Sequence, residues 1–354
     1  MAFLQYTKVC FVLCLCVIFS YLGALTTKNT VQRDFKKVAR YKSNPDRGLV
    51  ASVQRQTTTA EKEPVKPNEY IVSRDKLMTN ITREKTIQIF LPEIRPNEMK
   101  ITSSLTRLKR YNQTRSLPLI DSCAIVGNSG VLSDSSCGGV IDRANLVLRM
   151  NLAPAGGEYA RDVGSKTNIT TINSEQSRAM AACAEDEHAK TSVDNLPDNC
   201  RSLLRLMRRL NNTVIWYIRS FNMMKRIKKG LEFYEKYHGL KTSFAFSPLN
   251  PTRRTSKWMK VRHATTGAAI YLTATTFCRR VTLYGFYPRY VDPTNRTLRY
   301  HYYDDTPKNY STSPHSFNKE FEVWQSLQDD GYLQVINDCA GRWDKHDYRS
   351  QLDT

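Results

Sequence analysis

Two histidines are the residues of this sequence most suited to proton transfer. His301 lies in the string R-Y-H-Y-Y-D, which ends at Asp304, and His315 begins the string H-S-F-N-K-E, which ends at Glu320. An imidazole gains and loses a proton near neutral pH, so either histidine could act as an acid or a base. A histidine among tyrosines, or just ahead of a helix, is more often structural. The histidines alone therefore leave a catalytic and a structural interpretation open.

Two asparagines follow predicted strands. Residues 123–126 form a short apolar run, residues 127–130 (G-N-S-G) break it, and residues 145–150 form a second apolar run after a polar segment of about helix length. Strand, glycine-rich loop, helix and strand begin a Rossmann-like α/β domain, which binds its ligand at the carboxyl ends of its strands. Asn128 and Asn151 stand at those ends, so we expect them in a binding site.

The glycine pattern argues against one common use of this fold. The loop lacks the spacing G-x-G-x-x-G, and no acidic residue closes the second strand where a ribose would need it. A dinucleotide-dependent oxidoreductase is therefore poorly supported.

A third candidate binding segment precedes a predicted helix at residues 268–277. Thr265, Thr266 and Gly267 open this helix, and residues 281–286 form a strand after it. Hydroxyl groups and backbone N–H groups at a helix N-terminus can bind a phosphate or a carboxylate. The same residues also make an ordinary helix cap, so this segment alone does not distinguish an anion-binding site from a structural cap.

The order of these segments resembles the animal sialyltransferase family. Residues 123–166 contain C-A-I-V-G-N-S-G, a second cysteine, I-D-R-A-N, R-M-N and D-V-G-S-K, as in the large sialylmotif. Residues 257–288, with Cys278 inside them, resemble the small motif, H-Y-Y-D the third motif and H-x-x-x-x-E the very small motif. E-Y-A-R-D-V-G-S-K and the aspartate of H-Y-Y-D are most similar to the α2,8-sialyltransferase branch. Tyr287 departs from the tryptophan common in that branch.

The resemblance implies a fold and an activity. The fold would be a single Rossmann-like, GT-A-variant glycosyltransferase domain with a mostly parallel central sheet flanked by helices. The activity would be transfer of sialic acid from CMP-sialic acid, with inversion, to the 8-hydroxyl of a terminal sialic acid on a glycolipid or glycoprotein. The alternatives are a sialyltransferase of another linkage (α2,3 or α2,6 to Gal or GalNAc) and a catalytically silent lumenal glycan-binding protein.

The resemblance also assigns roles to the candidate residues. His315 would be the general base, Glu320 would support the local geometry, and His301 would donate to the departing phosphate. The remaining candidates would bind CMP-sialic acid: Asn128, Asn151, Thr265, Thr266 and Gly267, with Tyr287 lining the nucleotide pocket. The leaving group carries one phosphate and the sequence has no D-x-D motif, so we expect no metal and no cofactor.

Six cysteines lie beyond the apolar N-terminal run, and sequence alone does not choose among their pairings. No C-x-x-C pair occurs, so disulfides are favoured over a metal site. The resemblance implies the bonds Cys123–Cys278 and Cys137–Cys339, which leaves Cys183 and Cys200 to close a local loop.

The N-terminus predicts a membrane protein of the secretory pathway. Residues 9–25 are uncharged and apolar. The run lacks a sharp small-x-small cleavage site and a long polar stretch follows it, which favours a signal-anchor over a cleaved signal peptide. We predict a cytoplasmic tail at 1–8, a transmembrane segment at 9–25, a flexible stem at 26–84 and a lumenal catalytic domain at 85–354. The resemblance implies a single-pass type II protein of the Golgi membrane. Six N-x-S/T sequons agree with a lumenal body: Asn80, Asn112, Asn168, Asn211, Asn295 and Asn309.

A formal net charge of +20 favours anionic partners. A lumenal domain disfavours nucleic acid, which leaves an acidic glycan, a nucleotide and the membrane surface as partners. Basic residues crowd the approach to the small motif and could favour a sialylated acceptor, although they could equally be solvated: Arg253, Arg254, Lys257, Lys260 and Arg262. A homodimer is compatible with these expectations.

Overall fold

The computed structural model describes residues 83–90, 114–185, 196–218, 223–305 and 315–343. The chain divides into two units, 1–62 and 63–354, and every described residue belongs to the second. The predicted tail, anchor and nearly all of the stem lie outside the described residues, as do the sequons Asn80, Asn112 and Asn309. Among the described helices, none has the length and apolar character that a bilayer crossing requires.

One sheet organises the described part of the chain. Its nine strands are β1 (Gln88–Phe90), β2 (Thr114–Arg115), β3 (Ile120–Val126), β4 (Leu146–Arg149), β5 (Ile169–Thr171), β6 (Val214–Tyr217), β7 (Ser243–Phe246), β8 (Cys278–Tyr284) and β9 (Gln334–Ile336). They run in the order β2-β1-β7-β6-β5-β4-β3-β8-β9. Along this order, every neighbouring pair from β7 through β6, β5, β4, β3 and β8 to β9 is parallel. Within the sheet only β1 forms antiparallel pairs, with β2 and with β7. The predicted mostly parallel α/β sheet is confirmed.

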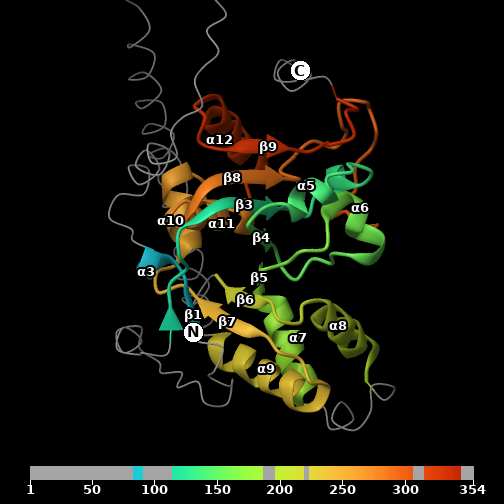
Figure 1. Ribbon diagram of the computed structural model, residues 1–354, viewed down its shortest axis with the longest axis vertical. Helices are drawn as coiled ribbons and strands as arrows, with labels where there is room; N and C mark the ends of the chain where they lie inside the picture. The colour runs from blue at the N-terminus through green and yellow to red at the C-terminus, as the bar shows by residue number, and fades with distance from the viewer. Residues whose placement is uncertain (1–82, 91–113, 186–195, 219–222, 306–314, 344–354) are drawn as a thin grey trace, which may run out of the picture. The chain divides into compact units, whose positions relative to one another are not determined.

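Helices flank this sheet. They are α3 (Arg83–Thr86), α5 (Gly138–Asp142), α6 (Ala160–Val163), α7 (Ser174–Glu185), α8 (Asp198–Arg209), α9 (Met224–His238), α10 (Pro251–Met259), α11 (Thr266–Ala274) and α12 (Phe317–Asp329), with 3₁₀ turns η2 (Gly130–Leu132) and η3 (Gly157–Tyr159). Helices α7, α8 and α9 gather at the end of the sheet near β6 and β7, whereas α12 lies beside β8 and β9 (Figure 1).

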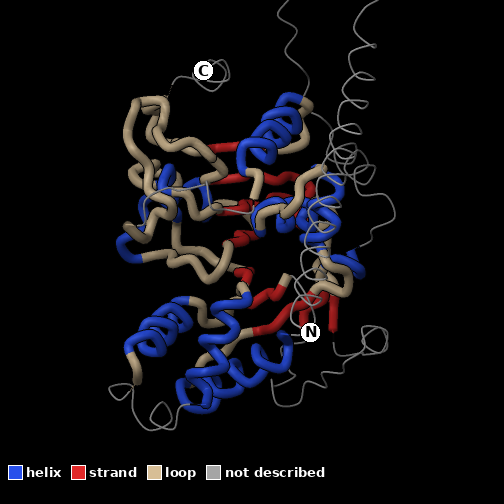
Figure 2. The backbone as a smooth tube through the Cα atoms, turned by 180° about the vertical axis from the view of Figure 1, so that it is seen from behind, coloured by secondary structure: helices blue, strands red, loops and turns tan. Residues whose placement is uncertain are grey.

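The chain changes direction across the sheet at β3. After β3 it adds β4, β5, β6 and β7 on one side, and it then returns to place β8 and β9 on the other side. An open α/β sheet forms its ligand crevice where the strand order reverses, outside the carboxyl ends of the strands. Loops gather at this edge of the sheet (Figure 2). The architecture therefore places a crevice at the ends of β3, β4 and β8.

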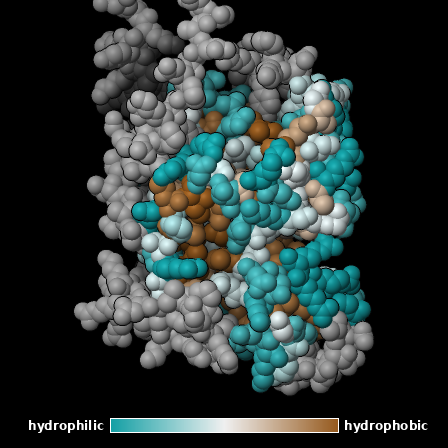
Figure 3. Space-filling model, viewed as in Figure 1, coloured by the Kyte–Doolittle hydropathy of each residue, from teal (hydrophilic) through white to brown (hydrophobic). Residues whose placement is uncertain are grey.

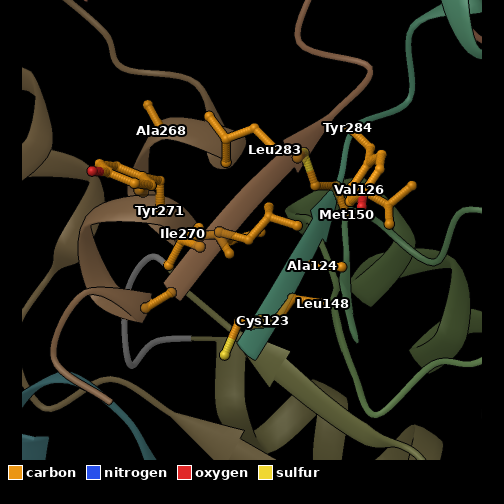
Figure 4. Packing of buried hydrophobic residues seen from close by; sticks show 14 of the residues in the cluster. Cys123, Ala124, Val126, Leu148, Met150, Ala268, Ile270, Tyr271, Leu283 and Tyr284 are labelled. Carbon is orange, nitrogen blue, oxygen red and sulfur yellow. The ribbon is translucent and has the colours of Figure 1, made fainter. Parts of the chain in front are cut away.

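The core is densest around β3. Residues 123–126 are buried because parallel neighbours pair with both edges of the strand and helices cover its faces. Helix α11 packs against β3 and β8, and Ile270, Leu283 and Ala124 belong to the same buried cluster (Figure 4). On the face shown in Figure 3, hydrophobic residues gather over these central strands and hydrophilic residues surround them. A second core cluster lies among α7, α8 and α9.

Three disulfides join cysteines of the described ranges, and their pairing confirms the one that the resemblance implied. Cys123–Cys278 joins β3 to β8, Cys137–Cys339 joins the segment before α5 to the C-terminal region, and Cys183–Cys200 joins α7 to α8. The first bond closes a separation of 155 residues. By the chain-entropy model such a bond contributes about 5 kcal/mol by restricting the unfolded chain.

The segment between β3 and β4 differs from its prediction. A helix was expected there, and the structure has the short turn η2 followed by the five-residue helix α5. Helix α5 begins in close contact with α6, since a Cβ atom at Gly138 would lie 1.9 Å from the carbonyl oxygen of Ala160. Only glycine permits this approach of two backbones.

Candidate active site

A pocket at the carboxyl edge of the sheet contains all nine residues that the sequence singled out for catalysis and donor binding. They are Asn128, Asn151, Thr265, Thr266, Gly267, Tyr287, His301, His315 and Glu320. The pocket has about 850 Å³ of empty space including its open mouth. Residues separated by nearly two hundred positions in the sequence therefore share one cavity.

Asn128 occupies the first turn after β3. Its Nδ2 atom donates to the backbone oxygen of Met150 (3.3 Å) and to the hydroxyl of Tyr303 (3.4 Å). Its Oδ1 atom is buried and has no hydrogen-bond partner among the described residues. A buried acceptor without a partner costs free energy, so this oxygen is suited to accept from a hydroxyl or amino group of a ligand.

Asn151 is held in a left-handed conformation after β4, with φ of 53°. Its backbone N–H donates to Thr171 Oγ1 (2.9 Å), and its backbone oxygen accepts from Gln176 Nε2 (2.5 Å). Thr171 Oγ1 also donates to Asn151 Oδ1 (3.3 Å). Asparagine tolerates this backbone conformation better than most residues. These bonds use the backbone and the side-chain oxygen of Asn151, so its NH₂ group is the part of this pocket-lining residue suited to donate to a ligand.

The N-terminus of α11 supplies further donors. Thr265 is the N-cap residue, and its Oγ1 accepts from the N–H of Ala268 (3.1 Å). Both donors of Thr265 bind Glu320: the backbone N–H reaches Oε1 (2.7 Å) and the hydroxyl reaches Oε2 (2.6 Å). The N–H groups of Thr266 and Gly267 have no acceptor within the described part of the chain. Thr265 therefore supports the helix cap, and its two successors are the residues able to donate to an anion.

Gly267 is required by its surroundings. A Cβ atom at this position would lie 2.8 Å from Phe286 Cε1 and 3.0 Å from Met150 Cε, and both of these side chains line the pocket. A larger residue would push these side chains into the cavity.

Glu320 ties α12 to α11. It lies in the first turn of α12, its residue is only 3% exposed, and it accepts the two bonds from Thr265. Burial raises the pKa of Glu320 to about 7, and the bonds from Thr265 oppose this shift. The carboxyl group thus orients the N-terminus of α11 relative to the segment that carries His315.

His315 has its ring fixed by the backbone. Its Nδ1 atom lies 2.9 Å from the carbonyl oxygen of His263. A carbonyl can only accept, so Nδ1 carries the hydrogen in the neutral ring and Nε2 carries the lone pair. This tautomer suits a base that uses Nε2.

His301 is fixed by two different contacts. Its Nδ1 atom lies 2.5 Å from Asp304 Oδ2, and its ring stacks on Tyr303 with centroids 4.9 Å apart and an interplanar angle of 8°. His301 lines the pocket, whereas Asp304 and Tyr303 are not among its lining residues. Residues outside the pocket lining therefore hold the ring, and Nε2 is the ring nitrogen that remains for a ligand.

Aromatic side chains complete one wall. Tyr287 packs against Phe321 (6.0 Å between centroids) and Trp343 (5.7 Å), and burial raises its pKa to about 12. Sequence reasoning missed several lining residues, among them Ser129, Tyr300, Phe286, Phe317 and Trp324. Ser129 and Tyr300 are direct neighbours of predicted residues, so proximity in sequence could have found them.

The D-V-G-S-K segment (residues 162–166) has a structural role, and none of its residues lines the pocket. Asp162 accepts from the backbone N–H groups of Asp134 (2.8 Å) and Ser136 (2.9 Å). The buried guanidinium of Arg149 donates to the carbonyl oxygens of Val163 (2.6 Å) and Lys166 (3.0 Å). This segment thus stabilises the large motif.

No cluster of three or more histidine, cysteine, aspartate or glutamate side chains suited to a metal occurs within the described residues.

A mostly parallel α/β sheet with a polar pocket at its carboxyl edge places the chain in a class that includes many nucleotide-binding enzymes. The family model for glycosyltransferase family 29 (sialyltransferase) matches residues 73–332 of the sequence. The chain belongs to this family, so it is a glycosyltransferase of the sialyltransferase type.

Two solved structures are similar to parts of this chain. The crystal structure of a mammalian sialyltransferase is 20% identical, with 79% of this chain and 82% of that chain covered and a TM-score of 0.39. The crystal structure of a mammalian sialyltransferase in complex with Gal-β-1-3GalNAc-ortho-nitrophenol is 19% identical, with 78% and 82% covered and a TM-score of 0.39.

Proposed function

We propose that this protein transfers sialic acid from CMP-sialic acid, with inversion, to the 8-hydroxyl of a terminal sialic acid on a glycolipid or glycoprotein. The observation that carries the proposal is the convergence of two oriented histidines and the open N-terminus of α11 on one pocket. Family membership supports sialyl transfer, and the sequence details of the large and third motifs support the α2,8 linkage.

The pocket suits an anionic donor that carries a phosphate and a carboxylate. The N–H groups of Thr266 and Gly267 are positioned to donate to one of these anions, since the dipole of α11 favours negative charge at its N-terminus. Asn128 Oδ1 is suited to accept from the nucleotide or the sugar. Tyr287 would line the nucleotide side of the cavity with its aromatic face.

Direct displacement needs a base and a group that receives the leaving phosphate. His315 Nε2 accepts the proton of the acceptor hydroxyl while the new bond to the anomeric carbon forms. The bond from that carbon to the phosphate oxygen breaks, and His301 Nε2 donates to the departing CMP. The leaving group is a monophosphate, so these donors can meet its charge without a metal.

A basic surface beside the pocket supports a sialylated acceptor. Five cations on α10 and the loop after it are exposed and form no ion pair with other described residues: Arg253, Arg254, Lys257, Lys260 and Arg262. Lys319 Nζ donates to the backbone oxygen of Lys260 (3.1 Å), which joins this surface to the first turn of α12. The carboxylate of a terminal sialic acid would be attracted to such a surface.

The same proposal includes the location. We propose a type II protein of the Golgi membrane, anchored by residues 9–25, with the stem at 26–84 and the catalytic domain at 85–354 in the lumen.

A CMP-release assay tests the function. The soluble domain should release CMP from CMP-sialic acid faster when an α2,3-sialylated acceptor is added than when its desialylated counterpart is added. Rising ionic strength should raise the KM for the sialylated acceptor, because exposed charges are screened over about 8–10 Å near physiological salt. Binding of glycan without any CMP release would indicate a silent binding protein.

A further inference from the structure

The two pocket histidines differ in what holds their Nδ1 atoms. His315 Nδ1 lies on the neutral carbonyl oxygen of His263 (2.9 Å), whereas His301 Nδ1 lies on the carboxylate of Asp304 (2.5 Å). A hydrogen bond between a charged group and its partner is shorter and stronger than a neutral one. The two rings therefore stand in different electrostatic surroundings within the same cavity.

The Asp304 contact decides what His301 can do at Nε2. The carboxylate accepts from Nδ1, so Nδ1 carries a hydrogen in both charge states of the ring. A neutral His301 would then have only a lone pair at Nε2 and could not donate to a phosphate. Donation from Nε2 thus requires the doubly protonated imidazolium, and a carboxylate at Nδ1 stabilises that cation.

The charges around His301 agree with this requirement. The titratable side chains that line the pocket with it are Tyr287, Tyr300, His315 and Glu320, and no lysine or arginine is among the described lining residues. The residues that β3, β4 and the N-terminus of α11 place against the pocket do not titrate. Tyr303 stacks on the ring from behind. A protonated His301 is therefore the cation that the described walls of the pocket can offer to an anionic leaving group.

We propose that Asp304 is a positioning residue that keeps His301 as an imidazolium, which makes His301 the proton donor to the leaving phosphate. The inference rests on the proposed function. As the anomeric carbon–oxygen bond breaks, the phosphate oxygen receives the hydrogen of His301 Nε2, and His315 Nε2 receives the hydrogen of the attacking hydroxyl. One proton is thus given and one taken in each turnover, and exchange with solvent restores both rings.

Neighbouring contacts hold this pair in place. His301 and Asp304 side chains are 28% and 31% exposed, so water screens them less than it screens a surface pair. Tyr302 donates from its backbone N–H to the carbonyl of Asn128 (2.9 Å) and from its hydroxyl to the carbonyl of Pro154 (2.5 Å). The string that carries both residues is thereby fastened to the loops after β3 and β4.

The test measures kcat, KM and the pH profile of kcat for Asp304→Asn and for a matched control, Asp305→Asn. Asp305 is the next residue, its side chain is 96% exposed, and it pairs with Arg299. Asp304→Asn should lower kcat ~10- to 100-fold, because a hydrogen bond to a charged group is lost, with little change in KM. The alkaline limb of its profile should move to lower pH, since the imidazolium is no longer stabilised. Asp305→Asn should match the wild type in both measurements.

A double-mutant cycle separates this role from a structural one. In a His301→Ala background, Asp304→Asn should cause no further loss of kcat, because Asp304 acts through His301. Asp304→Glu should recover part of the activity and the position of the alkaline limb. An equal loss in both backgrounds, or a wild-type profile for Asp304→Asn, would overturn the proposal.

A second readout does not need turnover. ¹⁵N–¹H spectra of histidine-labelled protein should show His301 with hydrogens on both nitrogens in the wild type and on one in Asp304→Asn. A wild-type His301 that is neutral in this spectrum would refute the inference even if the enzyme transfers sialic acid. An enzyme that shows the expected spectrum and transfers no sialic acid would instead refute the proposed function.

Discussion

Replacing Glu320 with glutamine should remove a pH dependence from the stability of the catalytic domain. Glu320 is 3% exposed, accepts two hydrogen bonds from Thr265, and has a pKa raised by burial to about 7 from an ordinary value of 4.5. Glutamine keeps the shape of the side chain and an acceptor for the N–H of Thr265, but it does not ionise. The substitution therefore tests the carboxyl charge with little change in packing.

The sign and the size of this pH dependence follow from the pKa of Glu320 in the unfolded chain and its pKa in the folded protein. Below the unfolded value both states hold the proton, so the group has no effect. Between about pH 4.5 and 7 the unfolded chain has lost the proton while the folded protein retains it, so the free energy of unfolding falls as pH rises. Each pKa unit corresponds to about 1.36 kcal/mol, which makes the total loss about 3 kcal/mol above pH 7.

The assay is chemical denaturation with the disulfides intact, measured from about pH 5 to about pH 8 for the wild type and for Glu320→Gln. The difference in unfolding free energy between the two proteins should change by about 2.5 kcal/mol over this range, with the wild type losing stability. Glu322→Gln, an exposed position on the same helix, is the matched control and should leave the wild-type curve unchanged. Parallel curves for the wild type and Glu320→Gln would refute the reasoning.

Three further outcomes follow from the site. His315→Ala should lower kcat by ~10²–10⁴-fold through loss of the base while calorimetric binding of CMP persists, and near-normal turnover would contradict its role. Gly267→Ala should weaken donor binding because its Cβ would lie 2.8 Å from Phe286 Cε1, whereas Gly139→Ala, with its nearest neighbour at 4.0 Å, should bind the donor normally. Activity should survive exhaustive chelation with EDTA, since the leaving group is a monophosphate; loss of activity that added manganese restores would show a metal requirement.

The central strands and the pocket could be predicted because their signals are local or carried by the ordered motifs. Residues 123–126 and 145–150 are apolar runs in the sequence, and the structure has β3 and β4 there. The nine candidate residues share one pocket because the topology brings the ends of β3, β4 and β8 together. The pairing of six cysteines came from the resemblance, since spacing alone does not choose among pairings.

Two helices, α7 and α10, were not predicted although the sequence contains recognisable N-terminal capping residues for both. Asn173 Oδ1 accepts from the N–H of Gln176 (2.8 Å), and Gln176 Oε1 accepts from the N–H of Asn173 (3.2 Å), which is a capping box at the start of α7. Asn250 accepts from the N–H of Arg253 (3.2 Å) and Pro251 follows it, so α10 also begins with a recognisable signal.

Contacts between distant segments were beyond sequence reasoning. The bond of His315 Nδ1 to the carbonyl of His263 spans 52 residues, and the bonds of Glu320 to Thr265 span 55 residues. No periodicity or composition marks such pairs, because tertiary packing alone decides which backbone groups face which side chains. The roles inferred from tautomers therefore required the structure.

Linkage analysis of the product tests the central claim most directly. The soluble domain is incubated with CMP-sialic acid and either an α2,3-sialylated acceptor or its desialylated counterpart, and the products are analysed by mass spectrometry and NMR. We predict an α2,8-linked disialyl product from the sialylated acceptor and little product from the other. Preferred transfer to the desialylated acceptor, with an α2,3 or α2,6 linkage to Gal or GalNAc, would contradict the α2,8 assignment.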